Sequence, residues 1–288
     1  MAAPMEAWDR QFHPGAAPFG NFINYYSFNP PEKRIRFLPE DLLNIISYSG
    51  RKKNATVLDI GCNSGDLTVA LYMHLKKQHL DKKEQGSSKM CLASADENDQ
   101  DISSNPAAIE PDNTVAIKVL GCDIDDTLIT RANESNLHPE SISFHRMDFM
   151  CDASRSSNLT EFLSRHSETS GRFDLVCCFS LTMWIHLQHG DAGLHKFLKE
   201  ASLLSRFLLV EPQPWKCYKS AVRRVRKVGI ENSWHFKELN IRDKVEEDII
   251  NYLTSTCQME LVRTLGETHW ERKLFLFRNA TGVSDTQS

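Results

Sequence analysis

The fold is indicated by one stretch, Val57-Leu58-Asp59-Ile60-Gly61-Cys62-Asn63-Ser64-Gly65-Asp66-Leu67. Its beginning is typical of a buried strand, and its end starts an amphipathic pattern typical of a helix. Gly61 and Gly65 allow the backbone to approach a ligand closely, and the helix start offers free N–H groups. The stretch therefore predicts a strand, a glycine turn and a helix that bind a ligand together.

Short apolar runs alternate with amphipathic runs along the rest of the chain. The expected strands lie at 57–60, 116–121, 142–144, 173–178, 207–210, 259–263 and 273–277, and the expected helices at 66–77, 126–134, 159–165, 192–204 and 237–253. Such alternation predicts an α/β fold with a mainly parallel sheet and ligands at the carboxyl ends of the strands. The close spacing of the last two strands predicts an antiparallel hairpin at the end of a seven-stranded sheet.

The domain organisation is expected to be simple. Residues 1–18 are rich in Ala, Pro and Gly and predict a flexible N-terminus, and 279–288 predict a flexible C-terminus. Residues 82–113 are polar and without periodicity, which predicts a disordered insertion. A single domain is therefore expected over 19–278.

Composition and charge exclude several classes of protein. The 288 residues are 41% hydrophobic and carry a net charge of −4, so a nucleic-acid partner has to bind a local patch. The 8 cysteines are scattered without a C-x-x-C pair, which favours free thiols in a reducing compartment over disulfides or zinc. There is no apolar leader and no run of roughly eighteen apolar residues, so neither secretion nor a membrane span is expected.

A basic segment follows the strand expected at 207–210. It starts with Glu211-Pro212-Gln213-Pro214-Trp215, where the prolines hold the chain extended and end the strand. A helix over 216–227 would carry cations on one side and apolar residues on the other. The cations are Lys216, Lys219, Arg223, Arg226 and Lys227, with Arg224 at their border, and the opposite residues are Cys217, Ala221, Val225 and Val228. This face favours phosphate binding, with a solvated charged face as the alternative.

The glycine turn disfavours NAD and resembles the loop of another cofactor. A dinucleotide fingerprint requires G-x-G-x-x-G, whereas the turn resembles the D-x-G-x-x-x-G loop of class I S-adenosylmethionine methyltransferases. Asp123 ends the next strand, where its carboxylate can accept hydrogen bonds from a ribose diol or cap a helix. Asp148 and Phe149 follow the third strand, where that class places residues against the adenine.

Further motifs resemble one family of these enzymes. The segment Phe179-Ser180-Leu181-Thr182-Met183-Trp184-Ile185-His186-Leu187 lacks the Asn or Asp followed by Pro-Pro and an aromatic residue that a nucleobase amino-methyltransferase would carry. It resembles instead the bicoid-interacting family of RNA 5′-phosphate methyltransferases. The other matching segments are Phe19-Gly20-Asn21-Phe22, Tyr25-Tyr26, Arg34-Ile35-Arg36-Phe37-Leu38 and Glu211-Pro212-Gln213-Pro214-Trp215.

The resemblance implies an activity and a set of site residues. One branch of the family caps the 5′-triphosphate of a nuclear small RNA, and the other methylates 5′-monophosphates of histidine tRNA and microRNA precursors. The compact chain resembles the second branch, which implies a cytoplasmic, monomeric enzyme that uses S-adenosylmethionine and acts on small RNA rather than on DNA or membranes. The implied cofactor-binding residues are Arg34, Tyr26, Asp59, Gly61, Asn63, Asp123, Ile124, Asp148, Phe149 and Phe179, the last in place of a smaller aliphatic residue.

The chemistry of phosphate methylation requires no general base. A terminal phosphate is already anionic at neutral pH, because its second pKa is about 6. Catalysis is therefore expected to consist of alignment, with Glu211, Gln213 and Trp215 as positioning residues. The expected RNA-binding residues are Trp215, Lys216, Tyr218, Lys219, Arg223, Arg226 and Lys227, with the two aromatic rings stacked on a terminal base.

Several alternatives remain open at the level of sequence. Trp215 is equally suited to core packing, and His186 with His189 supplies too few ligands for a metal site. Two alternative functions are a triphosphate-capping enzyme and a catalytically weak RNA-binding scaffold. Methylation of a protein or a small metabolite is a third alternative, which the basic helix disfavours.

Overall fold

The computed structural model describes residues 19–47, 54–77, 115–167, 171–227, 234–267 and 272–280. The flexible N-terminus predicted at 1–18 and the insertion predicted at 82–113 lie outside the described residues, as does 281–288 of the predicted flexible C-terminus. The domain boundary predicted after residue 278 is wrong by at least one residue. Asn279 is the last residue of a strand, and its buried side chain donates hydrogen bonds to the carbonyls of Ser202 and Ser205.

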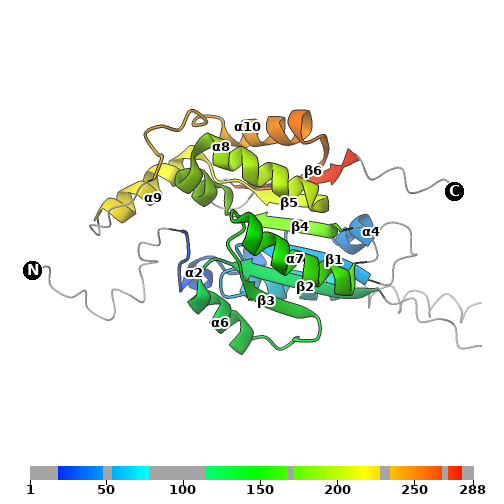
Figure 1. The fold of residues 1–288 in the computed structure, drawn as a ribbon. Coiled ribbons are helices and arrows are strands. Elements are labelled where there is room, and N and C mark those ends of the chain that lie inside the picture. Colours follow the sequence, from blue (N-terminus) through cyan, green and yellow to red (C-terminus); the bar gives the residue numbers. More distant parts are fainter. Residues whose placement is uncertain are drawn as a thin grey trace, which may run out of the picture.

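A seven-stranded sheet in the order β3-β2-β1-β4-β5-β7-β6 forms the centre of the molecule (Figure 1). The strands are β1 Asn54–Ile60, β2 Ala116–Asp123, β3 Ile142–Arg146, β4 Phe173–Phe179, β5 Ser205–Glu211, β6 Met259–Glu267 and β7 Lys273–Asn279. The first five pair in parallel, whereas β7 is antiparallel to both of its neighbours. The predicted mixed sheet and its terminal hairpin are therefore confirmed. Most strands extend past their apolar run, because polar residues at their ends continue the hydrogen-bond ladder.

Helices cover both faces of this sheet. They are α2 Tyr25–Phe28, α3 Glu32–Ile35, α4 Leu42–Ser47, the helical residues 66–77, α6 Asp126–Glu134, α7 Asp152–His166, α8 Thr182–Leu203, α9 Trp215–Lys227 and α10 Val245–Asn251, the last followed by a π-helix, Tyr252–Thr256. Side chains that alternate along each strand feed two separate cores: Leu58 and Cys178 pack with α7 and α8, while Val57 and Cys177 pack with α4 and residues 66–77. The strand order reverses between β1 and β4, so a crevice is expected at their carboxyl ends.

Three helices differ clearly from their predicted bounds, and α7 begins at Asp152, seven residues before the predicted start at 159. The other two differ for identifiable reasons. α8 begins ten residues before the predicted start at 192. Gly190, with φ of 68°, interrupts the helix, so its first part is separated from the part that the sequence pattern predicted. The helix predicted at 237–253 begins only at Val245. The Asp191 carboxylate accepts hydrogen bonds from the N–H groups of Asn240 and Ile241, which holds the preceding segment in a non-helical form.

Candidate active site

The glycine turn after β1 has a left-handed backbone at three positions. Gly61 and Gly65 have φ of 78° and 83°, and Asn63 between them has φ of 54°. A Cβ atom on Gly65 would lie 2.6 Å from the ring of Phe144 on β3, so the turn packs too closely for a side chain there. The Gly61 N–H donates to the carbonyl of Cys122 at 2.8 Å, which ties the turn to the end of β2.

Asp123, at the end of β2, directs its carboxylate toward this turn. Its Oδ2 accepts from the Asn63 N–H at 3.0 Å, and its Oδ1 accepts from the Asp125 N–H at 3.0 Å. Burial raises the pKa of Asp123, and these backbone hydrogen bonds oppose the rise. The alternative role of helix cap is wrong for Asp123, because the N-cap of α6 is Asp125, which accepts from Thr127 and Leu128. Asp123 therefore keeps acceptor capacity for a ligand.

Two adjoining pockets lie at the carboxyl ends of β1, β2 and β4. Both are lined by Phe19, Gly61, Asp123, Leu181 and Trp184. Of the residues predicted to hold the cofactor, the inner pocket adds Tyr26, Arg34, Asp59, Asn63 and Phe179, and the outer pocket adds Ile124, Asp148 and Phe149. The structure thus brings every predicted cofactor residue to the wall of one continuous site.

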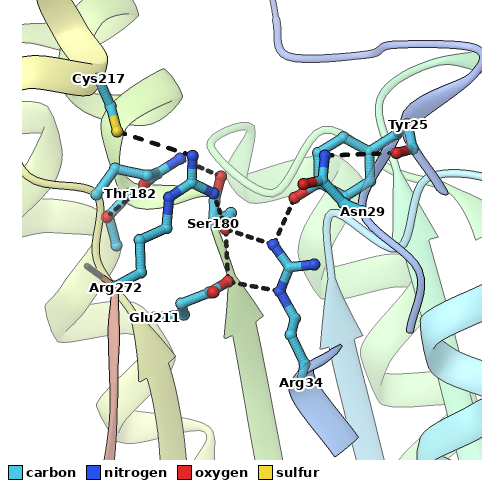
Figure 2. A network of polar contacts seen from close by, with 9 residues as sticks. Tyr25, Asn29, Arg34, Ser180, Thr182, Glu211, Cys217 and Arg272 are labelled. Carbon is cyan, nitrogen blue, oxygen red and sulfur yellow. Dashed lines mark hydrogen bonds and ion pairs between the residues drawn. The ribbon is translucent and has the colours of Figure 1, made fainter. Parts of the chain in front are cut away.

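Arg34 lies at the centre of a buried polar network (Figure 2). Its Nε donates to Glu211 at 2.8 Å, and its Nη2 donates to the Tyr25 hydroxyl at 2.6 Å and to Ser180 Oγ at 3.0 Å. Burial disfavours the charge, but Glu211 raises the pKa of Arg34 and keeps it cationic. The buried Nη1 has no hydrogen-bond partner among the described residues, although Arg34 lines the inner pocket. This nitrogen fits an anionic group of a ligand, such as a carboxylate.

Asp59 and Tyr26 both line the inner pocket. Burial raises the pKa of Asp59 to about 6, while the hydroxyl of Thr68, which donates at 2.6 Å, opposes the rise. The Tyr26 hydroxyl donates to the carbonyl of Cys62 at 3.2 Å, and burial raises its pKa. Hydrogen bonds within the protein thus fix both side chains. A positively charged ligand in the inner pocket would favour the ionised form of Asp59.

Residues 19–26, which we call the strap, pack against the pocket wall. Asn21 Nδ2 donates to Asp125 Oδ2 at 2.6 Å, and Asn63 Nδ2 donates to the carbonyl of Phe22 at 3.1 Å. Gly20 has φ of 76°, and a Cβ atom there would lie 2.4 Å from Nε1 of Trp184. The strap therefore joins the glycine turn, the start of α6 and the start of α8 around one site.

Ser180 is one of the site residues that sequence reasoning missed. It follows β4 with φ of 54°, and its Oγ accepts from Arg34 at 3.0 Å and from Arg272 at 2.7 Å while it donates to Glu211. Its only signal in the sequence was its place in the motif after β4. Arg272 precedes β7 and had no local signal, because it reaches the site only through the antiparallel pairing of the last strands.

The three predicted positioning residues lie in different surroundings in the structure. Glu211 and Gln213 are buried, and Gln213 Oε1 accepts from the Met183 N–H at 3.1 Å while its Nε2 donates to the Ser180 carbonyl. Both residues therefore support the turn after β4, and neither lines the inner or the outer pocket. Trp215 stacks on Phe236 with ring centroids 5.0 Å apart and an interplanar angle of 4°, so its contacts correspond to the packing alternative.

The basic helix α9 has the two sides expected from its sequence. All of its predicted outward cations are exposed: Lys216, Lys219, Arg223, Arg226 and Lys227. Ala221 and Val225 are buried and Cys217 is half-buried, while Val228 lies outside the described residues. The prediction that Tyr218 stacks on an RNA base is wrong. Tyr218 is 0% exposed, and its hydroxyl lies 3.0 Å from His186 Nδ1.

The two histidines considered as metal ligands lie in different surroundings. His186 is buried between Tyr218 and Asp191, whose Oδ1 lies 2.7 Å from its Nε2, and burial lowers the pKa of His186. His189 lines the outer pocket. Within the described ranges, no group of three His, Cys, Asp or Glu residues is placed to hold a metal ion. In the same ranges, no helix is both long and apolar enough to cross a membrane.

The strand order and the site at the β1–β4 switch define a class I S-adenosylmethionine-dependent methyltransferase. A crystal structure of the CurJ carbon methyltransferase shares this fold, with a TM-score of 0.52 and 11% identity over 90% of this chain and 57% of that one. The sequence profile described as bicoid-interacting protein 3 (Bin3) matches residues 173–279.

Relatives with named activities identify the family. The chain is 43% identical over 270 residues to a Bos taurus protein named RNA 5′-monophosphate methyltransferase. The aligned region covers 93% of this chain and 83% of that protein. It is also 43% identical over 267 residues to a Danio rerio protein named pre-miRNA 5′-monophosphate methyltransferase, over 92% and 94% of the two chains. A Mus musculus 7SK snRNA methylphosphate capping enzyme is 23% identical over 92% of this chain and 41% of that protein. The chain therefore belongs to the bicoid-interacting protein 3 family.

Proposed function

We propose that this chain transfers a methyl group from S-adenosylmethionine to an oxygen of the 5′-monophosphate of an RNA. The observation that carries this proposal is the arginine network that meets the inner pocket at Ser180, with Arg34 on one side and Arg272 on the other. Positive charge beside a methyl-donor pocket suits an anionic acceptor. The named activity of relatives that are 43% identical over most of the chain supports the same conclusion.

The pocket residues fit the proposed cofactor group by group. Asp123 would accept hydrogen bonds from the ribose hydroxyls, and Asp148 with Phe149 would contact the adenine in the outer pocket. Arg34 Nη1, which is buried without a partner among the described residues, would bind the carboxylate of the methionyl group. When bound, S-adenosylmethionine supplies an electrophilic methyl group on a sulfonium.

The proposed acceptor needs alignment rather than proton removal. The phosphate oxygen carries its negative charge already, because the second pKa of a phosphate monoester is about 6. Negative charge on the attacking oxygen decreases as the methyl group moves, so a cation on that oxygen would stabilise the ground state more than the transition state. The role of this chain is therefore to hold the other phosphate oxygens and leave one directed at the methyl group.

The RNA path is proposed along the exposed face of α9. Its five outward cations, Lys216, Lys219, Arg223, Arg226 and Lys227, would contact the phosphates that follow the RNA end. We extend the proposal to small RNAs, histidine tRNA and microRNA precursors, acted on by a monomer in the cytoplasm. The Danio rerio relative named for pre-miRNA supports the second substrate, and the free thiols of all described cysteines support a reducing compartment.

The test offers one RNA with three different 5′ ends together with a labelled methyl donor. The proposal predicts label on the 5′-monophosphate form and little on the 5′-hydroxyl or 5′-triphosphate forms. Preference for the triphosphate would indicate a capping enzyme instead, and equal labelling of the hydroxyl form would reject a phosphate acceptor. Binding of RNA without any labelling would indicate a scaffold. Asp123→Ala serves as the control that lacks the proposed ribose acceptor.

A further inference from the structure

Two guanidinium groups at the inner pocket share one carboxylate. Glu211 pairs with Arg34 at 2.8 Å, and it also acts electrostatically on Arg272, whose pKa it helps to raise against burial. Arg272 donates to Ser180 Oγ at 2.7 Å, so its guanidinium reaches the wall of the pocket from the side of β7 (Figure 2). Two guanidinium groups therefore meet at Ser180 on the edge of the inner pocket.

A third guanidinium group approaches the same point from α9. Arg224 follows Cys217 by seven positions, so the two side chains lie on the same face of the helix, two turns apart. Arg272 Nη2 lies 3.8 Å from the sulfur of Cys217. Arg224 is half-buried, and burial together with the charge of Arg272 lowers its pKa. Two cations are thus held near each other on the inner side of α9.

The contacts of Arg224 direct it toward the pocket rather than toward solvent. Its guanidinium carbon lies 5.7 Å from the ring centroid of Phe22, a residue of the strap. Phe22 packs edge-on against Trp184, which lines both pockets, with centroids 5.7 Å apart. Within the part of the chain that the structure describes, Arg224 forms no ion pair with a carboxylate. Arg224 thus packs against the strap beside the methyl-donor site, on the same helix as the exposed cations.

We propose that Arg224 and Arg272 bind the non-attacking oxygens of the terminal phosphate and so distinguish a phosphorylated RNA end from a hydroxyl end. This inference rests on the proposed function and names the residues that would recognise the phosphate of its substrate. Guanidinium groups suit the role, because each presents paired N–H donors that match two phosphate oxygens. A dianionic phosphate would relieve the repulsion between the two cations, which a neutral hydroxyl end cannot do.

The experiment measures binding rather than methyl transfer. A fluorescent RNA with either a 5′-phosphate or a 5′-hydroxyl is titrated with the protein in the presence of S-adenosylhomocysteine, and the ratio of the two affinities is recorded. Arg224→Gln should reduce that ratio about tenfold, the effect of losing one charge-assisted contact. Arg226→Gln, the matched control on the exposed face, should weaken both RNAs by similar factors and leave the ratio unchanged.

A second variant tests the role of Arg272 independently. Arg272→Lys keeps the charge but loses the paired donors, and it should also reduce the ratio while S-adenosylhomocysteine affinity stays at the wild-type value. If Arg272→Lys does not fold, Arg224→Gln decides alone, because Arg224 is only half-buried. A wild-type ratio in Arg224→Gln would overturn the inference even if the wild-type protein methylates 5′-monophosphates. Failure of the wild-type protein to methylate any RNA end would instead count against the proposed function.

Discussion

The two sides of the site are built in opposite ways. On the cofactor side, carboxylates lie at the carboxyl ends of successive strands: Asp59 is the penultimate residue of β1, Asp123 is the last residue of β2, and Asp148 follows β3. On the acceptor side, Arg224 and Arg272 come from α9 and the residue before β7, and Arg34 of α3 lies at the border of the two sides; these residues come together only in the folded chain. The cofactor side is thus marked by local sequence at the ends of parallel strands, whereas the acceptor side is assembled from segments that are far apart in the chain.

The largest effect is expected from removing the carboxylate on the acceptor side. Glu211→Gln leaves the buried guanidinium of Arg34 without its counter-charge, and loss of one partner of a buried pair costs about 3–5 kcal/mol. The free energy of unfolding, measured by urea denaturation, should fall by this amount. Glu260→Gln removes an exposed pair with Arg278 and should cost less than about 1 kcal/mol. Equal losses in the two variants would contradict the description of Glu211 as the anchor of that side.

A slightly smaller effect is expected from removing the ribose acceptor on the cofactor side. Asp123→Ala deletes the carboxylate that would accept two hydrogen bonds, worth about 3 kcal/mol or roughly 100-fold in affinity. Calorimetric titration with S-adenosylhomocysteine should show this loss. Asp126→Ala, an exposed carboxylate in the first turn of α6, should leave the affinity nearly unchanged. Retained binding in Asp123→Ala would remove Asp123 from the site.

The buried charge of Asp59 predicts a pH dependence of stability. Its folded pKa, about 6, is raised by burial above the value near 4 that is usual for an unfolded chain. The folded state therefore binds more protons between these values, and stability falls as pH rises through this window, by about 2–3 kcal/mol. Asp59→Asn should flatten the curve between about pH 4 and pH 6 relative to the wild-type protein. Parallel curves for the two proteins would contradict the raised pKa.

The smallest effect concerns the strap that joins both sides. Gly20→Ala places a Cβ atom 2.4 Å from the Trp184 indole, so the strap has to move away from the pocket. Affinity for S-adenosylhomocysteine should fall about fivefold, equivalent to ~1 kcal/mol. Gly171→Ala is the matched control, because its φ of 70° imposes similar backbone strain while nothing lies within 4 Å of the new atom. Similar affinities in the two variants would show that the strap does not shape the site.

The cofactor side could be predicted from sequence because its signals are local. Asp59, Gly61 and Asn63 lie within one turn, and the register of parallel strands brings the end of β2 beside it. All predicted cofactor residues consequently line the two pockets.

The acceptor side was predictable only where one helix carries the pattern. The exposed cations of α9 follow from its periodicity, and the same periodicity places Tyr218 seven positions before the buried Val225, so its burial was present in the pattern. Arg272 meets Ser180 across 92 residues, and Arg34 meets Glu211 across 177. Such contacts depend on the strand order, which local periodicity does not specify.

The position of the transferred methyl group tests the central claim most directly. RNA with a 5′-monophosphate is labelled by the wild-type protein, digested to nucleotides and separated, and the labelled nucleotide is identified. We predict that the label lies in the 5′-terminal nucleotide, as an ester on its phosphate. Label on a base or on an internal ribose would contradict the division of the site into a methyl-donor side and a phosphate-binding side.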